Sequence, residues 1–466
     1  MTALCFEDWT KARDEIRAGS LSAEIYTQAM LDQIAARDAD VNAFITLDAD
    51  AALASARDVD ACIASGESVG PLAGIPYALK DIIDTAGIRT TCHSAIRANH
   101  VPTQDATCAE RLKHSDGVLL GKLATHEFAI GGPSFDLPWP PARNPWNTGY
   151  FPGGSSSGSG AAVAAGMVAF ALGTDTAGSV RNPASLCGIV GLKPTYGRVS
   201  RHGVFPLSFS LDHVGPMTRR VRENAHLLNV IAGYDALDPG SANVATEDFT
   251  RHLGKGIQGL RVGLIRHFYT EDVDAEPDVR NGVDDAAQQL TALGAEVVEV
   301  RTRELREYIE CNRVLLTSEA FSVHEEWLQE RPQDYGALAR ERLSVGAFLR
   351  AVDYVQANRT KRLLCEHMNA LFKDVDVLVT ASSMDRTCRI DDTAEVTRTY
   401  QRQSRAPFNL TGLPALSMPC GFDGNGLPLA FQLIAPAFAE AKLYQVAEAY
   451  EAATTWHQTQ PQFLSV

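Results

Sequence analysis

The sequence lacks the long apolar segment that a membrane-spanning helix requires. No run among its 466 residues approaches the roughly 18 apolar residues of such a helix. Residues 1–9 also lack the basic and then apolar pattern of a signal peptide. We therefore expect a cytoplasmic protein that does not bind membranes.

Positive charge is scarce. Lysine and arginine together number 42 against 57 aspartates and glutamates, which gives a formal net charge of -15. A chain of this charge is repelled by nucleic-acid phosphates and by anionic lipids. We expect no direct nucleic-acid partner.

Paired cysteine motifs are missing as well. The nine cysteines are scattered, and none belongs to a CxxC pair. An odd number without paired spacing argues against a disulfide framework and against a zinc cluster. We expect most of them to be small buried side chains, and we predict no metal site.

No internal repeat and no clean linker interrupts the chain. Apolar runs of strand length alternate with segments of helical periodicity: strands are predicted at residues 72–79, 375–380, 411–419 and 427–433, and helices from Ser22, at 124–129, at 279–293, over most of 303–372 and at 438–456. This alternation is typical of an α/β sheet covered by helices on both faces. We predict one large domain, residues 1–466, with a mixed central sheet.

Two loops of small residues, 153–160 and 173–178, enclose the apolar segment 161–172. Glycine permits backbone geometries closed to other residues and lets a ligand approach the main chain. The loops therefore indicate a site at which backbone N–H groups face a ligand. A flexible glycine-serine linker is the alternative, but the apolar segment between the loops is typical of a buried core.

Residues 154–158 also match G-x-S-x-G, the nucleophile elbow of α/β-hydrolases with a Ser–Asp–His triad. That elbow requires an apolar strand immediately before it, whereas residues 147–153 are mostly turn formers. The context therefore argues against this interpretation.

Several motifs together resemble the amidase signature of Ser–Ser–Lys amidases. They are Gly74-Ile-Pro-Tyr-Ala-Leu-Lys80-Asp81, Gly153-Gly154-Ser155-Ser156, Gly-Thr-Asp-Thr-Ala-Gly-Ser at residues 173–179, Cys187-Gly188, Gly191-Leu-Lys-Pro-Thr195 and the segment 409–421. The signature core covers about residues 70–220, and about residues 240–400 match loosely, as a variable substrate-shaping region would. The resemblance implies the amidase signature fold and amide chemistry without a metal or an organic cofactor.

The resemblance assigns three catalytic roles. Ser179 would be the nucleophile, Lys80 the base, and Ser155, preceded by a cis peptide bond, the proton relay. Lys80 must be neutral to accept a proton, and burial lowers the pKa of a lysine. The apolar run before Lys80 is consistent with such burial.

The second loop offers donors for an oxyanion. The candidates are the consecutive N–H groups of Thr176, Ala177, Gly178 and Ser179. Ala177 stands where the family commonly has glycine, so positive φ is not expected there. Ser156 is expected to cap a helix or to make supporting hydrogen bonds, and Asp175 and Arg181 are expected to form a buried pair.

Substrate contacts are expected from two other segments. Gly131 and Gly132 lie in an irregular loop of the kind that lines pockets. Arg398, Arg402 and Arg405 precede Asn409, where members of the family that use glutamine tend to place a carboxylate. Arginines repel an ammonium and attract a carboxylate or an aromatic ring, and Arg402 is our candidate for substrate contact.

We therefore predict a hydrolase that cleaves a small-molecule carboxamide, through a seryl acyl-enzyme, to a carboxylate plus ammonia or an amine. The alternative is the glutaminase A subunit of a tRNA-dependent amidotransferase. A non-catalytic scaffold is disfavoured because Lys80, Ser155 and Ser179 are all present. The oligomeric state stays open, with a homodimer as one option.

Overall fold

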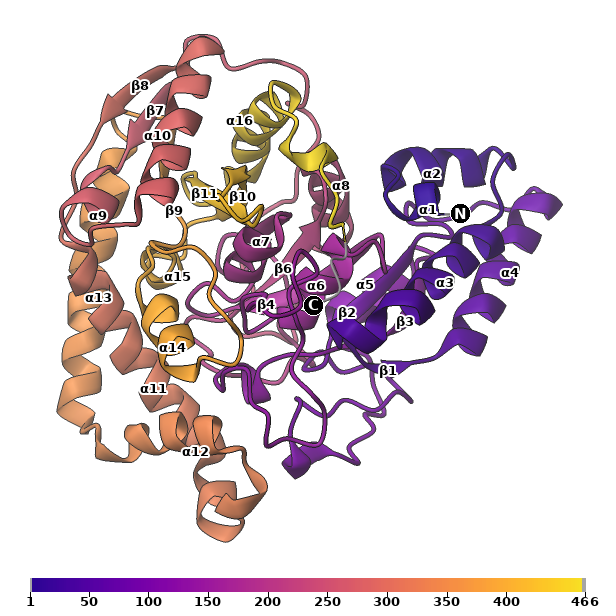
Figure 1. The fold of residues 1–466 in the computed structure, drawn as a ribbon, viewed down its shortest axis with the longest axis horizontal. Coiled ribbons are helices and arrows are strands. Elements are labelled where there is room, and N and C mark those ends of the chain that lie inside the picture. The colour runs from indigo at the N-terminus through magenta and orange to yellow at the C-terminus, as the bar shows by residue number, and fades with distance from the viewer. Residues whose placement is uncertain (1, 463–466) are drawn as a thin grey trace.

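The computed structural model describes residues 2–462, and their strands form one mixed sheet of eleven (Figure 1). In spatial order the strands are β1 (Phe44–Leu47), β3 (Val118–Leu123), β2 (Pro76–Lys80), β4 (Phe170–Asp175), β6 (His213–Thr218), β5 (Val190–Lys193), β10 (Ala415–Phe422), β11 (Pro428–Ile434), β9 (Val377–Ala381), β7 (Arg261–Leu264) and β8 (Glu296–Glu299). Strand β2 pairs in parallel with β3 and β4, strand β7 pairs in parallel with β8 and β9, and the other pairs are antiparallel. The predicted mixed α/β fold is confirmed.

Helices flank this sheet. They are α1 (Thr2–Cys5), α2 (Trp9–Arg17), α3 (Ala23–Val41), α4 (Ala49–Ser65), α5 (Thr107–Lys113), α6 (Ser157–Ala164), α7 (Arg181–Cys187), α8 (Val221–Ile231), α9 (His267–Thr270), α10 (Pro277–Ala292), α11 (Leu305–Glu330), α12 (Ala337–Ser344), α13 (Ala351–Leu371), α14 (Thr393–Gln401), α15 (Ala406–Leu410) and α16 (Glu440–Ala452). In Figure 1 the N-terminal helices lie beside β1 to β3, and α9 and α10 lie at the opposite end of the sheet, beside β7 to β9, with α11 to α13 on the same side of the molecule. Helices α6 and α7, which follow the two serine loops, pack near the centre.

The central strands are apolar on both faces. Every residue of β2 and of β4 is buried, which explains why these segments appear in the sequence as continuous apolar runs rather than as alternating patterns. Because β2 lies between β3 and β4, its last residue, Lys80, reaches the interior of the molecule with its side chain fully buried. The topology thus places one ionisable group beside the loop that follows β4.

Some predicted elements differ from the observed ones. Ser22 caps α3 as predicted, accepting a hydrogen bond from the Ile25 N–H at 3.3 Å. Residues 124–129 contain only a 3₁₀ turn at Glu127–Ala129, because the His126 N–H donates to the Ser155 carbonyl at 3.0 Å instead of to a helical carbonyl. The last helix is shorter than predicted, and β10 starts four residues later than predicted, after a left-handed turn at Gly412.

A continuous apolar core runs through the described residues. It includes Trp9 at one end of the chain and Tyr450 at the other, and six of the nine cysteines are buried. Across residues 2–462, no helix is both long enough and apolar enough to cross a membrane. On the strength of this shared core we propose that the chain forms a single domain.

Candidate active site

Lys80 is held between two hydroxyl groups. Its Nζ lies 2.7 Å from Ser155 Oγ and 2.8 Å from Thr174 Oγ1. Burial lowers the pKa of Lys80 to about 7, although the charges of Asp212 and Asp175 oppose this shift. At neutral pH a substantial fraction of the amine is therefore neutral.

The first serine loop packs too tightly for any side chain at Gly154. A Cβ there would lie 2.0 Å from Cε1 of the His126 ring, and the peptide bond from Gly154 to Ser155 is cis. The Ser155 carbonyl accepts hydrogen bonds from the His126 N–H at 3.0 Å and from Thr125 Oγ1 at 2.9 Å. These contacts fix the orientation of Ser155, whose side chain is buried beside Lys80.

The second serine loop is tied to the first. The Ser179 carbonyl accepts a hydrogen bond from the Ser156 N–H at 3.2 Å. Ser156 occupies the N-cap position of α6 but does not cap it; its Oγ bonds instead to the backbone N–H and carbonyl of Thr174. Among the residues described, none hydrogen-bonds the Ser179 hydroxyl, which is therefore available to a substrate.

A buried ion pair braces the second loop. The Asp175 carboxylate accepts hydrogen bonds from Arg181 Nη2 at 3.0 Å and from Asn409 Nδ2 at 2.8 Å, and both charged side chains are fully buried. Although burial opposes its ionisation, the Arg181 guanidinium and these hydrogen bonds hold the pKa of Asp175 well below its usual value. Arg181 also donates to Gln432 on β11, so this hydrogen-bonded group connects the loop after β4 to a strand on the other side of the β5–β10 pair.

The predicted set of oxyanion donors needs one correction. The Gly178 N–H donates to Asp175 Oδ1 at 2.8 Å and is therefore already engaged. The N–H groups of Thr176, Ala177 and Ser179 have no acceptor within residues 2–462. Ala177 does not adopt positive φ, so alanine fits at this position without strain.

Two of the arginines that precede Asn409 lie in different surroundings. Arg402 Nε lies 2.8 Å from the Asp385 carboxylate, and its Nη2 donates to the Asp274 carbonyl, which holds it away from the serine loops. Arg405 is buried, and its side chain lies directly against Gly178. It precedes Asn409 by four residues, a spacing that places both side chains on one side of a helical turn.

Gly131 and Gly132 lie in a loop that is hydrogen-bonded to the variable region of about residues 240–400. Arg342 Nη1, from α12, donates to the Gly131 carbonyl at 2.6 Å, and the Glu127 carboxylate accepts from the Gly336 N–H at 2.9 Å. Burial raises the pKa of Glu127 to about 7. Arg342 could not be identified from the sequence, because residues of about 240–400 carry no recognised motif.

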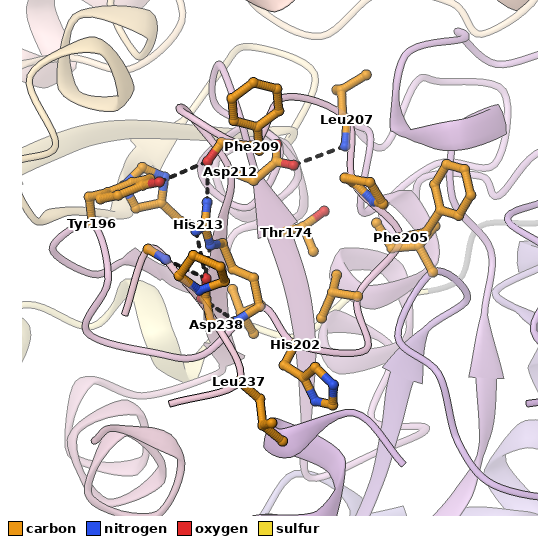
Figure 2. A pocket seen from close by; sticks show the side chains of 17 residues that line it. Thr174, Tyr196, His202, Phe205, Leu207, Phe209, Asp212, His213, Leu237 and Asp238 are labelled. Atoms are coloured by element: carbon orange, nitrogen blue, oxygen red, sulfur yellow. Dashed lines mark hydrogen bonds and ion pairs between the residues drawn. The ribbon is translucent and has the colours of Figure 1, made fainter. Parts of the chain in front are cut away.

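A cavity of about 500 Å³ adjoins the lysine side of the site. Figure 2 shows Thr174 among its lining residues, together with Phe205, Asp212 and His213. Thr174 accepts the Lys80 hydrogen bond, so one residue of the cavity wall contacts Lys80. Ser155, Ser179 and Arg405 do not line it.

Two histidines near the site contact backbone and aromatic groups. His93 Nε2 contacts the Trp139 carbonyl, and the His126 ring stacks on Phe151. Residues 2–462 contain no group of three or more histidine, cysteine, aspartate or glutamate side chains that could hold a metal ion.

Comparison with known proteins gives one family. The family model described as Amidase matches residues 26–444. The A subunit of glutamyl-tRNA(Gln) amidotransferase from Geobacter sp. (strain M21) is 38% identical over 95% of this chain and 96% of its own. A chain from a vestigial protein complex that reveals the origins of an s-triazine catabolic enzyme is 35% identical with a TM-score of 0.88, over 94% of this chain and 97% of its own. Native peptide amidase from Stenotrophomonas maltophilia is 31% identical with a TM-score of 0.87, and the match covers 98% of this chain and 99% of the peptide amidase.

Proposed function

Because this chain belongs to the amidase family, whose members act on C–N bonds, we propose that it cleaves a carboxamide by acyl transfer through Ser179. The observation that carries the proposal is the buried Lys80 Nζ at 2.7 Å from Ser155 Oγ. A hydroxyl is a weak nucleophile until a base accepts its proton. A lysine whose pKa is lowered to about 7 supplies such a base at neutral pH.

The proposed reaction has two halves. Ser179 Oγ attacks the amide carbon while its proton passes to Ser155, whose own proton passes to neutral Lys80. The N–H groups of Thr176, Ala177 and Ser179 stabilise the oxyanion. The proton then returns through Ser155 to the leaving amine, the C–N bond breaks, and water hydrolyses the resulting ester by the same relay, which releases the carboxylate and restores Ser179.

Two biological settings fit this chemistry. The named curated relatives favour the A subunit of a glutamyl-tRNA(Gln) amidotransferase, which would hydrolyse glutamine and work with partner subunits. The local chemistry favours hydrolysis of a different amide, because among the described residues no carboxylate just before Asn409 is free to bind the ammonium of glutamine. Asp385 is the nearby acid, and Arg402 and Arg398 already bind it, at 2.8 Å and 3.3 Å.

Labelling with a fluorophosphonate tests the nucleophile. We expect a single adduct on Ser179, located by peptide mass spectrometry, and no labelling of the Ser179→Ala variant. Ser157→Ala, at the start of α6, is the matched control and is expected to label normally. An adduct on Ser156 or on a cysteine would refute the assignment.

Rates of ammonia release from glutamine and from other small amides distinguish an amidotransferase subunit from a free-standing hydrolase. If the chain is one component of an amidotransferase, glutamine is the best substrate and its hydrolysis increases when partner subunits are added. If it is a free-standing hydrolase, small amides without an ammonium exceed glutamine in kcat/KM, and the isolated chain is fully active.

A further inference from the structure

A buried cation beside the second serine loop forms no ion pair within residues 2–462. The Arg405 side chain is 1% exposed. Its Nη1 donates to the Ser382 carbonyl at 2.9 Å and to Ser383 Oγ at 2.6 Å, and its Nε has no hydrogen-bond partner in the described chain. Burial lowers the pKa of Arg405 to about 10, so the group stays charged at neutral pH.

This arrangement differs from that of the neighbouring arginines. Arg181 is equally buried and is neutralised by Asp175 at 3.0 Å, and Arg402 is neutralised by Asp385 at 2.8 Å. A buried charge without a counter-charge is strongly unfavourable unless something pairs with it. A ligand that carries an anionic group can supply the counter-charge that Arg405 lacks.

The position of Arg405 indicates where that ligand binds. A Cβ on Gly178 would lie 2.4 Å from Arg405 Nε and 2.7 Å from Arg405 Cδ, so the stem of the Arg405 side chain lies against the loop that carries Ser179. Asn409, four residues further on, holds Asp175 in place. Tyr400, which interacts electrostatically with Arg405, donates from its hydroxyl to the Gly154 carbonyl in the other serine loop.

We propose that Arg405 binds the carboxylate of an anionic amide whose scissile carbonyl lies at Ser179. This inference rests on the proposed acyl-transfer function. Nη1 is anchored to residues 382 and 383, which leaves the edge formed by Nε and Nη2 to take a carboxylate with two parallel hydrogen bonds. The substrate class is therefore a small amide that carries a carboxylate a few bonds from the amide carbon.

Protection against fluorophosphonate labelling tests this proposal without requiring turnover. The probes are succinamate, neutral butyramide and cationic β-alaninamide, which are similar in size. In the unmodified protein we expect succinamate to slow labelling of Ser179 at least about tenfold more than either other amide, because a charge-assisted pair forms. Arg405→Met is expected to abolish this difference and Arg405→Lys to retain part of it, while Arg402→Met, the matched control, keeps it.

Kinetics provide the second measurement. For Arg405→Met, kcat/KM for ammonia release from succinamate should fall about 10–100-fold while that for butyramide changes less than about threefold. Equal loss on both amides would show that Arg405 only supports the loop and would overturn the proposal. If Arg405→Met does not fold, the selectivity of the unmodified protein and of Arg405→Lys decides.

The two levels of proposal fail in different ways. Normal labelling of Ser179 without protection by succinamate refutes the carboxylate contact and leaves acyl transfer intact. Absence of any Ser179 adduct refutes the proposed function, and the inference about Arg405 fails with it.

Discussion

Lys80 is the residue on which the proposed chemistry depends, because only its neutral form accepts a proton from Ser155. Burial lowers its pKa to about 7. Below this pH the amine is protonated and the relay is blocked; above it the amine is free. We therefore expect kcat/KM to rise with pH, to pass its midpoint near about pH 7 and then to level off, measured from about pH 5 to about pH 9.

Substitution of the lysine completes this test. Lys80→Met should lower kcat by about 10²–10⁴-fold, the usual contribution of a positioned base, while circular dichroism shows a folded protein. Lys122 is a comparable control because its side chain is also fully buried, yet its Nζ donates to the Ile83 carbonyl and to Thr90 Oγ1. A Lys122→Met variant should keep the pH midpoint, and a fully active Lys80→Met variant would place the base elsewhere.

At the residue scale, sequence reasoning named Lys80 and the two serines from their motifs and named Arg402 as a substrate contact, whereas the arginine that lies against the second serine loop in the structure is Arg405. Lys80, Ser155 and Ser179 lie in motifs, so their positions follow from local sequence. Which arginine turns inward depends on distant partners instead: Asp385 draws Arg402 outward, and Ser382 and Ser383 draw Arg405 inward. No local pattern encodes those partners.

At the element scale, the loop between β4 and α7 depends on the Asp175–Arg181 pair. Asp175→Asn keeps the shape but leaves the Arg181 charge buried without an anion, which should cost about 3–5 kcal/mol of the free energy of unfolding. We expect a lower Tm and a loss of activity, measured by thermal unfolding and ammonia release. Exposed Glu271, which pairs with Arg301 at 2.7 Å, is the control; Glu271→Gln should leave Tm unchanged.

The same pair predicts a response to acid. The pKa of Asp175 is lower in the folded than in the unfolded chain, so its contribution to stability is present above the unfolded pKa of about 4 and is lost as pH falls below it. The Asp175→Asn variant should therefore lose less stability than the unmodified protein on acidification below about pH 4. Equal Tm values for the two proteins at neutral pH would contradict the role given to the pair.

Strands were easier to predict than irregular segments. Buried runs such as β2 and β9 are continuous apolar segments, whose pattern identifies them. Strand β6 carries no such pattern, because Gly215 and Pro216 interrupt it, and its place in the sheet is set by its neighbours β4 and β5. The turn at Glu127–Ala129 is likewise set by a contact with the distant Ser155 carbonyl.

At the scale of the whole molecule, one junction joins two parts of the sheet. The first six strands in the spatial order come from residues 44–218 and the other five from residues 261–434, and they meet where β5 pairs with β10. Arg181 crosses the same boundary by donating to Asn409 and Gln432. The proposed active site therefore needs both parts, since Ser179 lies in one and Arg405 in the other.

This junction predicts cooperative unfolding. Calorimetry should give one transition, and its midpoint should coincide with those of far-UV circular dichroism, tryptophan fluorescence and loss of activity. A covalent phosphonyl group on Ser179 that contacts both parts stabilises the native state, so the whole transition should move to higher temperature. Two transitions, of which labelling moves only one, would show that residues 44–218 and 261–434 unfold independently and would contradict the single domain.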